Sequence, residues 1–322
     1  MAGLDIPRAH GSGVAFVTGA GGFLGGATTA ALTAAGWRVA AFGPRGRFAE
    51  DHAGARQPAM WNPVALNSRG LRAAAKDLGA PEIVFHAAGG ASVGASLASP
   101  ETDRERTVGS LRETLDFITS NAPEARLIYP SSAAVYGTGA AGALSEKARM
   151  SPISPYGLHK RTAEEMIAEA RASAGLDAVI IRFFSVYGPG LRKQLLWELA
   201  GRLKDAPGSL ELSGKGEEAR DFLYIDDAVR LIGLMAARRT KPAPLVINGG
   251  AGQAITVRQA AEGLCKALGA SSAIGFSGQA RPGDPPSLVA DIALARSLGF
   301  EPQVSFEAGL ERFAQWTGLA GS

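Results

Sequence analysis

The fold of this chain is decided by the stretch Val14-Ala15-Phe16-Val17-Thr18-Gly19-Ala20-Gly21-Gly22-Phe23-Leu24-Gly25. It begins with an apolar run of strand type, and an alanine-rich helical pattern follows the glycines as far as Gly36. Gly19 permits a tight turn, Gly22 lets a pyrophosphate approach the backbone, and Gly25 lets the helix pack closely on the strand, while the helix N-terminus offers N–H groups to the anion. The order strand, glycine turn, helix therefore predicts a dinucleotide site. Its predicted contacts are Gly19, Gly22, Phe23, Leu24 and Gly25.

The residue after the second predicted strand bears on which dinucleotide is bound. The strand runs from Arg38 to Phe42, and the next position, which usually carries the acidic residue that holds the adenosine ribose, is Gly43. No carboxylate stands there to repel a 2′-phosphate, and Arg45 and Arg47 could form bidentate hydrogen bonds with such a phosphate. A pair of solvated loop arginines is the alternative interpretation. The predicted cofactor is therefore NAD or NADP.

Two further strands are predicted to complete the cofactor side of the sheet. Met60-Trp61-Asn62 ends the third strand, where Asn62 is placed to hydrogen-bond an adenine. The fourth strand is predicted in the segment Ile83 to Gly89. The small residues Ala87 and Ala88 at its end would let a cofactor lie against the strand.

Polar side chains at two strand ends are candidates for chemistry. His86 could act as a base, but a single histidine at a strand end is more often a hydrogen-bonded structural residue, and we predict that role. The fifth predicted strand, Arg126 to Tyr129, is followed by Ser131 and Ser132. Ligands of open α/β sheets bind at the carboxyl ends of the strands, so these hydroxyls are predicted to contact a substrate, with the capping of a turn as the alternative.

A tyrosine and a lysine stand four residues apart in Ser154-Pro155-Tyr156-Gly157-Leu158-His159-Lys160, at the start of a helical pattern. That spacing places both side chains on one face of the helix, one turn apart. A phenol has an ordinary pKa of about 10, but an adjacent ammonium favours the phenolate and makes it a usable proton acceptor near neutral pH. Tyr156 is therefore a candidate general base whose pKa is adjusted by Lys160. The alternative is a solvated pair on an exposed helix.

Composition bounds the class of protein. With 322 residues, 46% hydrophobic and 20% charged, the chain is typical of a soluble globular protein. The formal net charge of +3 is spread along the chain without a basic block, so nucleic acid is not an expected partner. Residues 1–13 are predicted to form a flexible tail, and no apolar run is long enough for a signal peptide or a membrane span. Cys265, the single cysteine, lies in an apolar helical pattern and is predicted to be a core thiol in a reducing cytoplasm.

From about Val14 to Trp316 the sequence resembles the extended short-chain dehydrogenase/reductase family, in its branch of nucleotide-sugar epimerases, dehydratases and reductases. The segments that carry this resemblance are, in chain order, Thr18 to Gly25, Ser131 to Gly137, Tyr156 to Lys160, Arg182 to Gly190, Arg220 to Asp227 and Arg281 to Asp284. Their occurrence together, in this order, makes the resemblance specific. It implies an α/β fold, a Rossmann-type doubly wound parallel sheet with a smaller C-terminal mixed α/β substrate lobe. Residues 14–185, with returning segments near 221–250, would form the NAD(P)-binding domain, and residues 186–322 mainly the nucleotide-sugar lobe.

The resemblance also implies a catalytic set. Tyr156 would exchange a proton with a sugar hydroxyl or ketone, Ser132 would hydrogen-bond the same oxygen, and Lys160 would lower the tyrosine pKa and hold the nicotinamide ribose. Hydride would move between the sugar carbon and C4 of the nicotinamide. No metal is implied.

Substrate contacts are implied in the C-terminal half as well. Arg220 and Arg281 fall in matching motifs and could neutralise the diphosphate of a nucleotide sugar by forked hydrogen bonds, with solvated arginines as the alternative. The residues implied in substrate binding are Ser131, Ser132, Ser185, Arg220, Arg281 and Asp284.

Several positions depart from the family pattern. Ala133 and Ala134 stand where dehydratases of the family place an acidic pair, so no carboxyl acid or base is available there for 4,6-dehydration. Ser185 and Arg106 each stand where the family usually has an asparagine. Leu288 falls near the position whose bulk, in related 4-epimerases, decides whether an N-acetyl group at C2 fits. These differences concern the identity of the substrate rather than the fold.

The leading functional prediction is a nucleotide-sugar C4 epimerase, which oxidises the C4 hydroxyl to a ketone with bound NAD(P), lets the sugar turn over and returns hydride to its other face. An NADPH-dependent 4-keto-sugar-nucleotide reductase is the alternative, favoured by Gly43 and the arginines that follow it. A non-catalytic NAD(P) sensor is disfavoured because it would have no chemical need of the catalytic set. By resemblance, the helices Thr102 to Asn121 and Pro155 to Ala174 would form the interface of a homodimer, and neither nucleic acid nor a membrane is an expected partner.

Overall fold

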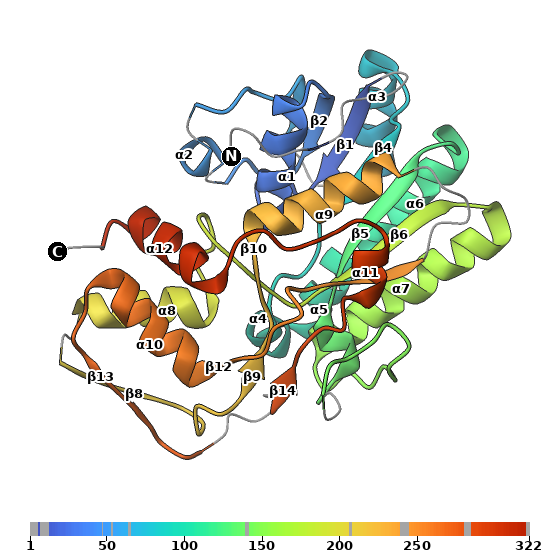
Figure 1. Cartoon of the computed structure of the whole chain (residues 1–322). Helices are drawn as coiled ribbons and strands as arrows, with labels where there is room; N and C mark the ends of the chain where they lie inside the picture. Colours follow the sequence, from blue (N-terminus) through green and yellow to red (C-terminus); the bar gives the residue numbers. More distant parts are fainter. Residues whose placement is uncertain are drawn as a thin grey trace.

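A parallel sheet forms the centre of the computed structural model (Figure 1). Its strands are β1 (Val14–Thr18), β2 (Arg38–Phe42), β3 (Met60–Asn62), β4 (Ile83–His86), β5 (Arg126–Ser132), β6 (Asp177–Phe183) and β11 (Val246–Gly249). The structure describes residues 6, 13–46, 48–52, 54–63, 66–138, 142–205, 208–238, 245–279 and 285–319, and within them these seven strands run in the order β11-β6-β5-β4-β1-β2-β3. Neighbouring strands are parallel throughout, which confirms the predicted doubly wound α/β fold.

The central strands are apolar because both faces of the sheet are covered. Every residue of β1 is buried, as expected of a parallel strand inside an α/β layer structure. The fifth strand is predicted to end at Tyr129. The strand instead pairs with β6 as far as Ser132, which lies opposite Phe183. The strand order reverses between β1 and β4, and the carboxyl ends of strands at such a reversal form the crevice in which α/β sheets bind ligands.

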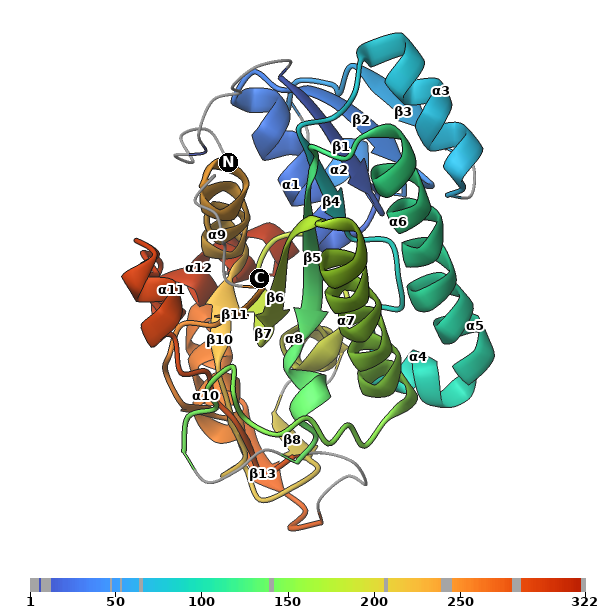
Figure 2. The same ribbon diagram turned by 90° about the vertical axis from the view of Figure 1, so that its right-hand side faces the viewer.

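Helices cover both faces of the sheet (Figures 1 and 2). On one face, α1 (Phe23–Ala34) packs against α9 (Ile225–Ala237), although the two are far apart in sequence. On the other face lie α3 (Ser68–Leu78), α6 (Ser110–Asn121) and α7 (Pro155–Ala174). The segment that supplies α9 and β11 therefore returns from the C-terminal half to complete the sheet.

The long helix predicted over Thr102 to Asn121 is not uniform. Its first part, α5 (Pro100–Arg104), begins at a proline, which suits a first turn because that turn needs no N–H donor. Between α5 and α6 the segment Glu105–Gly109 is π-helical. Inside this wider turn the Thr107 hydroxyl accepts a hydrogen bond from the backbone N–H of Gly90 at 2.9 Å. The departure from a regular helix is thus stabilised by a tertiary contact with the loop after β4, and π-helical turns of this kind occur often at functional sites.

The remaining elements form a smaller lobe, at the lower left in Figure 1. Its strands pair as β7 (Ser185–Tyr187) with β10 (Phe222–Tyr224), β9 (Ala219–Arg220) with β12 (Ile255–Thr256) and β14 (Ser287–Leu288), and β8 (Ser209–Leu212) with β13 (Ala273–Phe276). Its helices are α8 (Gln194–Asp205), α10 (Val257–Leu268) and α12 (Phe306–Thr317), whereas α11 (Ala293–Ser297) packs beside β11 of the main sheet. We propose the boundary between the cofactor domain (14–185, with segments near 221–250) and the substrate lobe (186–322) at β7, because β7 pairs with β10 and not with the main sheet.

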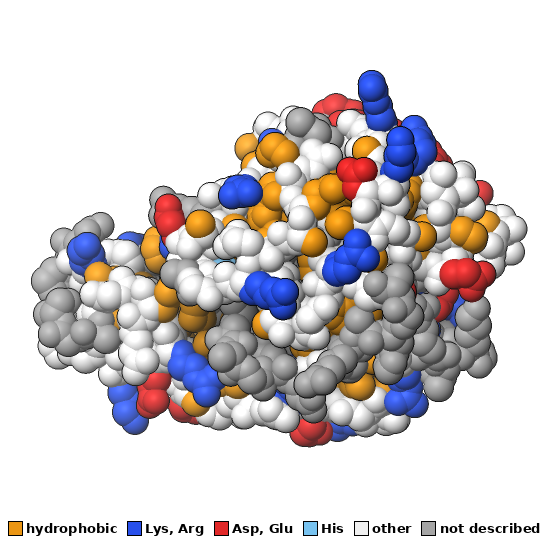
Figure 3. All heavy atoms as spheres, turned by 90° about the horizontal axis from the view of Figure 1, so that it is seen from above, with side chains coloured by type: hydrophobic (Ala, Val, Ile, Leu, Met, Phe, Trp, Pro, Cys, Tyr) orange, Lys and Arg blue, Asp and Glu red, His pale blue; other side chains and the backbone are white. Residues whose placement is uncertain are grey.

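The short connecting helices are α2 (Phe48–Asp51), α4 (Val93–Ala98) and the 3₁₀ turn η2 (Ala133–Tyr136). Cys265 on α10 is buried, so the predicted core thiol is confirmed. Of the predicted tail, only Ile6 and Gly13 are described, and Ile6 is buried against Gly233 of α9. Among the described residues no helix is both long and apolar enough to span a bilayer. On the face shown in Figure 3, acidic and basic side chains are interspersed with apolar ones.

Candidate active site

The glycine turn after β1 has a conformation and a packing that only glycine allows. Gly19 has a φ of +64°, and a Cβ at this position would lie 2.6 Å from the carbonyl carbon of Ala87 at the end of β4. A Cβ at Gly25 would lie 2.2 Å from the carbonyl oxygen of Gly19. The turn is therefore pressed between β4 and the first turn of α1, as the spacing predicts.

The start of α1 fits the pyrophosphate of a dinucleotide. The N-cap residue of α1 is Gly22, and no side chain caps the helix there, so its first N–H groups are left for an anion. Phe23 and Leu24 are half-buried in this first turn. The role of Gly21 was not predicted from the sequence. A Cβ at this position would lie 1.9 Å from the carbonyl oxygen of Pro44, so only glycine fits. The loop after β2 thus packs directly on the glycine turn, and together these features fit a bound NAD or NADP.

The adenosine side of this site contains an exposed arginine. The carbonyl oxygen of Gly43 accepts a hydrogen bond from the indole N–H of Trp61 at 2.9 Å. The Arg45 guanidinium lies 5.3 Å from the centre of the Trp61 ring, in cation–π geometry. Asn62 ends β3 and is half-buried, and the backbone N–H of Gly43 donates to its carbonyl oxygen. Arg47 lies outside the described residues.

The structural role predicted for His86 is confirmed. The side chain is fully buried at the end of β4, and its Nδ1 lies 3.0 Å from the Thr18 hydroxyl and 2.9 Å from the Thr114 hydroxyl. Burial lowers the pKa of His86 to about 3, and the nearby Lys160 ammonium adds to this effect. A neutral histidine therefore links β1, β4 and α6.

His86 gives the fold a predicted sensitivity to acid. Its pKa is about 3 in the folded protein and 6.5 ordinarily, so below pH 6.5 the unfolded chain takes up a proton that the folded protein does not bind. Stability should therefore fall as the pH is lowered, by about 3 kcal/mol between pH 6.5 and pH 4 from this group. Urea unfolding of the wild type and of His86→Gln at several pH values measures it. A variant with the same pH dependence as the wild type would contradict the prediction.

The three side chains of the predicted catalytic set come together beside the end of β5. Ser132 ends this strand, and its hydroxyl is hydrogen-bonded to the phenol of Tyr156 and accepts from the backbone N–H of Ala134 at 3.2 Å. The Lys160 ammonium is buried and lies 5.9 Å from the centre of the Tyr156 ring. It donates to the carbonyl oxygen of Pro130 at 2.8 Å.

The local sequence explains why the start of α7 places Tyr156 next to Ser132. Ser154 caps the helix by accepting from the backbone N–H of Gly157 at 3.2 Å, and Pro155 occupies the first turn. A Cβ at Gly157 would lie 2.5 Å from the carbonyl oxygen of Ala134. The start of α7 can therefore pack directly on the turn that follows Ser132.

The electrostatics of this set differ from the expectation in one respect. The resemblance implies that Lys160 lowers the pKa of Tyr156, whereas in this structure burial of the phenol raises that pKa, against the opposing hydrogen bond from Ser132. Burial also lowers the pKa of Lys160 to about 8.

Ser131 is not placed to contact a substrate, which corrects the sequence prediction. Its hydroxyl donates to Glu164 of α7, and Glu164 pairs with the guanidinium of Arg182 at 2.6 Å. All three side chains are buried. Neighbouring residues of a strand point to opposite faces, so Ser131 enters this ionic cluster while Ser132 meets Tyr156.

The predicted substrate residues of the C-terminal half are only partly described. Ser185 begins β7 and is half-buried, and its backbone N–H donates to the carbonyl oxygen of Asp221. Arg220 lies on β9 and is half-buried, with Nη1 donating to the carbonyl oxygen of Ala219 at 2.9 Å. Arg281 and Asp284 lie outside the described residues.

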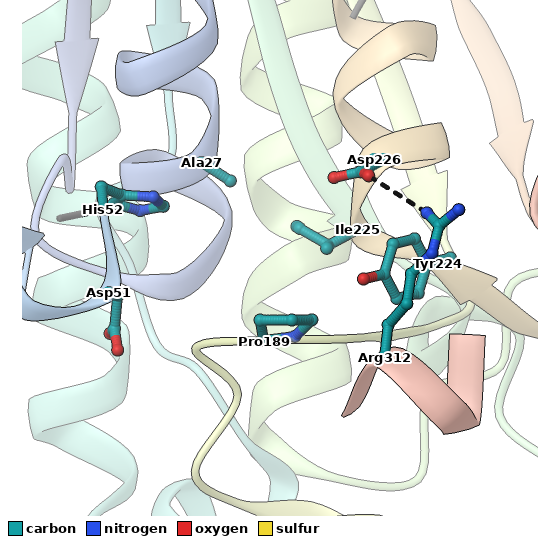
Figure 4. A pocket seen from close by; sticks show the side chains of 8 residues that line it. All are labelled: Ala27, Asp51, His52, Pro189, Tyr224, Ile225, Asp226 and Arg312. Atoms are coloured by element: carbon teal, nitrogen blue, oxygen red, sulfur yellow. Dashed lines mark ion pairs between the residues drawn. The ribbon is translucent and has the colours of Figure 1, made fainter. Parts of the chain in front are cut away.

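A pocket of about 280 Å³ lies elsewhere, between α1, α2, the start of α9 and α12 (Figure 4). Its lining residues are Ala27, Asp51, His52, Pro189, Tyr224, Ile225, Asp226 and Arg312. Arg312 approaches Asp226 to 3.7 Å across one side of it. None of Ser132, Tyr156 and Lys160 lines this pocket, so the candidate chemistry is not located here.

Sequence reasoning also missed Asp103 and His159. His159 Nδ1 lies 2.6 Å from Asp103 Oδ2, and both side chains are buried next to the catalytic set. Nothing in the sequence pattern distinguishes Asp103 from an ordinary acidic residue in the first turn of a helix. The one signal available was the position of His159, directly before Lys160 in the tyrosine–lysine segment.

Comparison with known proteins agrees with this site. A model described as the NAD dependent epimerase/dehydratase family matches residues 15–250. UDP-glucuronate 4-epimerase 4 from Arabidopsis thaliana is 30% identical over 251 residues, which cover 72% of this chain and 57% of the plant enzyme. The chain thus spans little more than half the length of that curated relative.

Two solved structures are similar over nearly the whole chain. UDP-glucose 4-epimerase from Thermotoga maritima, with UDP-glucose, has a TM-score of 0.83 and 25% identity, covering 95% of this chain and 98% of that one. A tyrosine-to-phenylalanine mutant of UDP-glucuronic acid 4-epimerase from Bacillus cereus, in complex with a fluorinated UDP-glucuronic acid and NAD, has a TM-score of 0.82 and 25% identity, covering 95% and 99%. Because the family model spans the glycine turn and the Ser132, Tyr156 and Lys160 positions alike, this chain belongs to the NAD-dependent epimerase/dehydratase family, as its motifs indicate.

Proposed function

We propose that this protein is a nucleotide-sugar C4 epimerase that works with bound NAD. The observation that carries the proposal is the meeting of Ser132 at the carboxyl end of β5 with Tyr156 and Lys160 of α7, separated by β4 from the strand that leads into the glycine turn. The similar proteins named above are C4 epimerases of UDP-sugars, which supports a UDP-hexose as the substrate.

Each part of the site has a task in this proposal. The glycine turn and the uncapped N-terminus of α1 would hold the pyrophosphate, Asn62 and Arg45 would border the adenosine, and Ala87 and Ala88 would face the nicotinamide side. When bound, NAD supplies a reversible acceptor for the hydride of the sugar carbon.

The catalytic side chains handle the proton and the sugar oxygen. Tyr156, as its phenolate, would take the proton of the C4 hydroxyl and later return it to the C4 oxygen. Ser132 would hydrogen-bond the same oxygen, and Lys160 would stabilise the phenolate and bind the nicotinamide ribose. In the lobe, Ser185 would contact the substrate and Arg220 would pair with its diphosphate, with Arg281 and Asp284 proposed from the sequence pattern alone.

The experiment that tests this proposal is an epimerisation assay with isotope readout. Purified protein with NAD is incubated with UDP-glucose, UDP-glucuronate or UDP-N-acetylglucosamine in D₂O, and the products are examined by NMR. We expect the C4 epimer of one of these substrates, without deuterium at C4, because the hydride returns to the carbon from which it came. The absence of an epimer with all three substrates would overturn the proposed substrate class.

A second candidate function is an NADPH-dependent reductase of a 4-keto-sugar nucleotide. Gly43 leaves no carboxylate to repel a 2′-phosphate, and Arg45 is exposed on Trp61 beside it. In this case Arg45→Ala should weaken NADPH binding by about tenfold, because the 2′-phosphate of NADPH loses its charged partner. NADH has no 2′-phosphate, so its binding should be unchanged. Titration calorimetry measures both affinities, with the exposed Arg72→Ala on α3 as the matched control. Tight NAD in the purified protein, with no preference for NADPH, would exclude the reductase.

We further propose that the protein is a homodimer in the cytoplasm. The family's expected interface uses the helices Thr102 to Asn121 and Pro155 to Ala174. Leu158 on α7 is 50% exposed and Leu97 on the neighbouring α4 is 59% exposed, which leaves apolar surface at one end of this face. Light scattering after size exclusion should give twice the mass of the chain, and Leu158→Glu should lower it. A monomeric wild type at micromolar concentration would remove the proposal.

A further inference from the structure

A carboxylate and a histidine lie buried between the helices that carry and support the catalytic set. Asp103 of α5 is 5% exposed and His159 of α7 is 8% exposed. Nδ1 of His159 lies 2.6 Å from Oδ2 of Asp103, a short hydrogen bond between two buried side chains. Because His159 directly precedes Lys160, this bond ties the turn of α7 that contains Tyr156 and Lys160 to α5.

The other side of Asp103 is closed by the loop after β4. A Cβ at Gly90 would lie 1.8 Å from Oδ1 of Asp103, so the glycine backbone lies directly against the carboxylate. A Cβ at the preceding Gly89 would lie 3.9 Å from the Lys160 ammonium nitrogen. The Asp103 carboxylate therefore lies between His159 and the Gly90 backbone, and the same loop after β4 also approaches Lys160.

The charge of Asp103 acts electrostatically on the pKa values of both Lys160 and Tyr156. Burial lowers the pKa of Lys160 to about 8, and Asp103 is the strongest influence in the opposite direction. Burial raises the pKa of Tyr156, and Asp103 raises it further. The other charged or titratable groups that face these two side chains are Glu164 of α7, Lys193 of the segment after β7, Tyr129 of β5 and the neutral His86 of β4.

We propose that Asp103, held by His159, is a positioning residue for the reaction: it fixes the Tyr156–Lys160 turn and places a constant negative charge beside both catalytic side chains. The role in catalysis rests on the proposed epimerase function. The effect of the charge on Tyr156, in contrast, is measurable without any substrate.

The first test is a pH titration of tyrosinate by ultraviolet absorbance, in which Tyr156→Phe identifies the contribution of Tyr156. Asp103→Asn removes the charge but keeps the shape and an oxygen that accepts from His159. We expect the midpoint of Tyr156 to fall by about 0.5 to 1 pH unit. Asp116→Asn, an equal charge change at an exposed site of α6, should leave it unchanged. A midpoint that does not fall in Asp103→Asn overturns the proposal.

A double variant covers the case in which the single variant does not fold. Asp103→Asn with His159→Gln keeps a hydrogen bond between two neutral amides and leaves no buried charge unpaired, and the same fall in the Tyr156 midpoint is expected. If the double variant folds and its midpoint equals that of the wild type, the proposal is likewise overturned.

The second test is the pH dependence of kcat for UDP-sugar epimerisation. If Tyr156 must be deprotonated to act, the acidic limb of the profile should move to lower pH in Asp103→Asn by a similar amount. A purely structural role would lower the rate at every pH and leave the limb in place, and that result would overturn the positioning role. A wild type without epimerase activity would overturn the proposed function alone, because the tyrosinate titration still decides the effect of Asp103.

Discussion

Tyr156→Phe is expected to lower kcat of the proposed epimerase by about 10²- to 10⁴-fold, the usual contribution of a positioned acid–base group. The variant keeps the ring but loses the hydroxyl that is hydrogen-bonded to Ser132 and would exchange a proton with the sugar oxygen. KM should change little, because the lobe residues and the cofactor turn are untouched. Initial rates of interconversion of a UDP-sugar with saturating NAD measure the effect.

A tyrosine outside the site provides the matched control for this variant. Tyr224→Phe removes a hydroxyl at the end of β10, next to the pocket of Figure 4 and away from Ser132, so it should retain the wild-type rate. Unfolding curves of both variants should resemble that of the wild type. A Tyr156→Phe protein that epimerises as fast as the wild type would remove Tyr156 from the mechanism.

Gly19→Ala is expected to weaken NAD binding by at least about 100-fold, or about 2.7 kcal/mol. A Cβ at this position would enter the backbone of Ala87 at 2.6 Å, and the φ of +64° is unfavourable for alanine. Either the turn or the end of β4 must move, and the first turn of α1 then no longer faces the pyrophosphate. Stability should also fall, by about 1 to 3 kcal/mol. Calorimetric titration with NAD and urea unfolding measure the two effects.

The control is a glycine with the same kind of backbone but free space around it. Gly36 has a φ of +90°, and a Cβ there would meet nothing within 4 Å. Gly36→Ala should therefore lower stability by about 1 kcal/mol through backbone strain and leave NAD affinity unchanged. Equal NAD affinities of Gly19→Ala and the wild type would show that this turn does not hold the cofactor.

The parts of the molecule that the sequence predicts well are those with local causes. The conformation of Gly19 and the packing of Gly25 follow from their spacing between a strand and a helix, and the parallel sheet covered by helices follows from the alternation of strands and helices. The meeting of Ser132 with Tyr156 was expected from the family resemblance, and the buried, neutral His86 from the usual behaviour of a histidine at a strand end.

The features that escaped prediction depend on neighbours that are distant in sequence. Nothing in the order of Ser131 and Ser132 tells which hydroxyl meets Tyr156, because the pleat and the location of Glu164 decide it. The π-helical segment Glu105–Gly109 forms where Thr107 meets the loop after β4. The pKa of Tyr156 depends on the burial of its phenol and on Ser132 and Asp103, which no spacing rule gives.

The return of β11 to the edge of the sheet has a consequence for how the chain folds during synthesis. β6 ends at Phe183, but its partner begins only at Val246, so the ribosome has to add the whole intervening segment before the pair forms. At cellular rates this takes roughly 3 to 12 seconds. Throughout that interval Ile180 and Ile181 belong to a strand that pairs with β5 on one side and leaves its other edge unpaired, a template for association between nascent chains. We therefore expect the growing chain to be most prone to association before β11 is added.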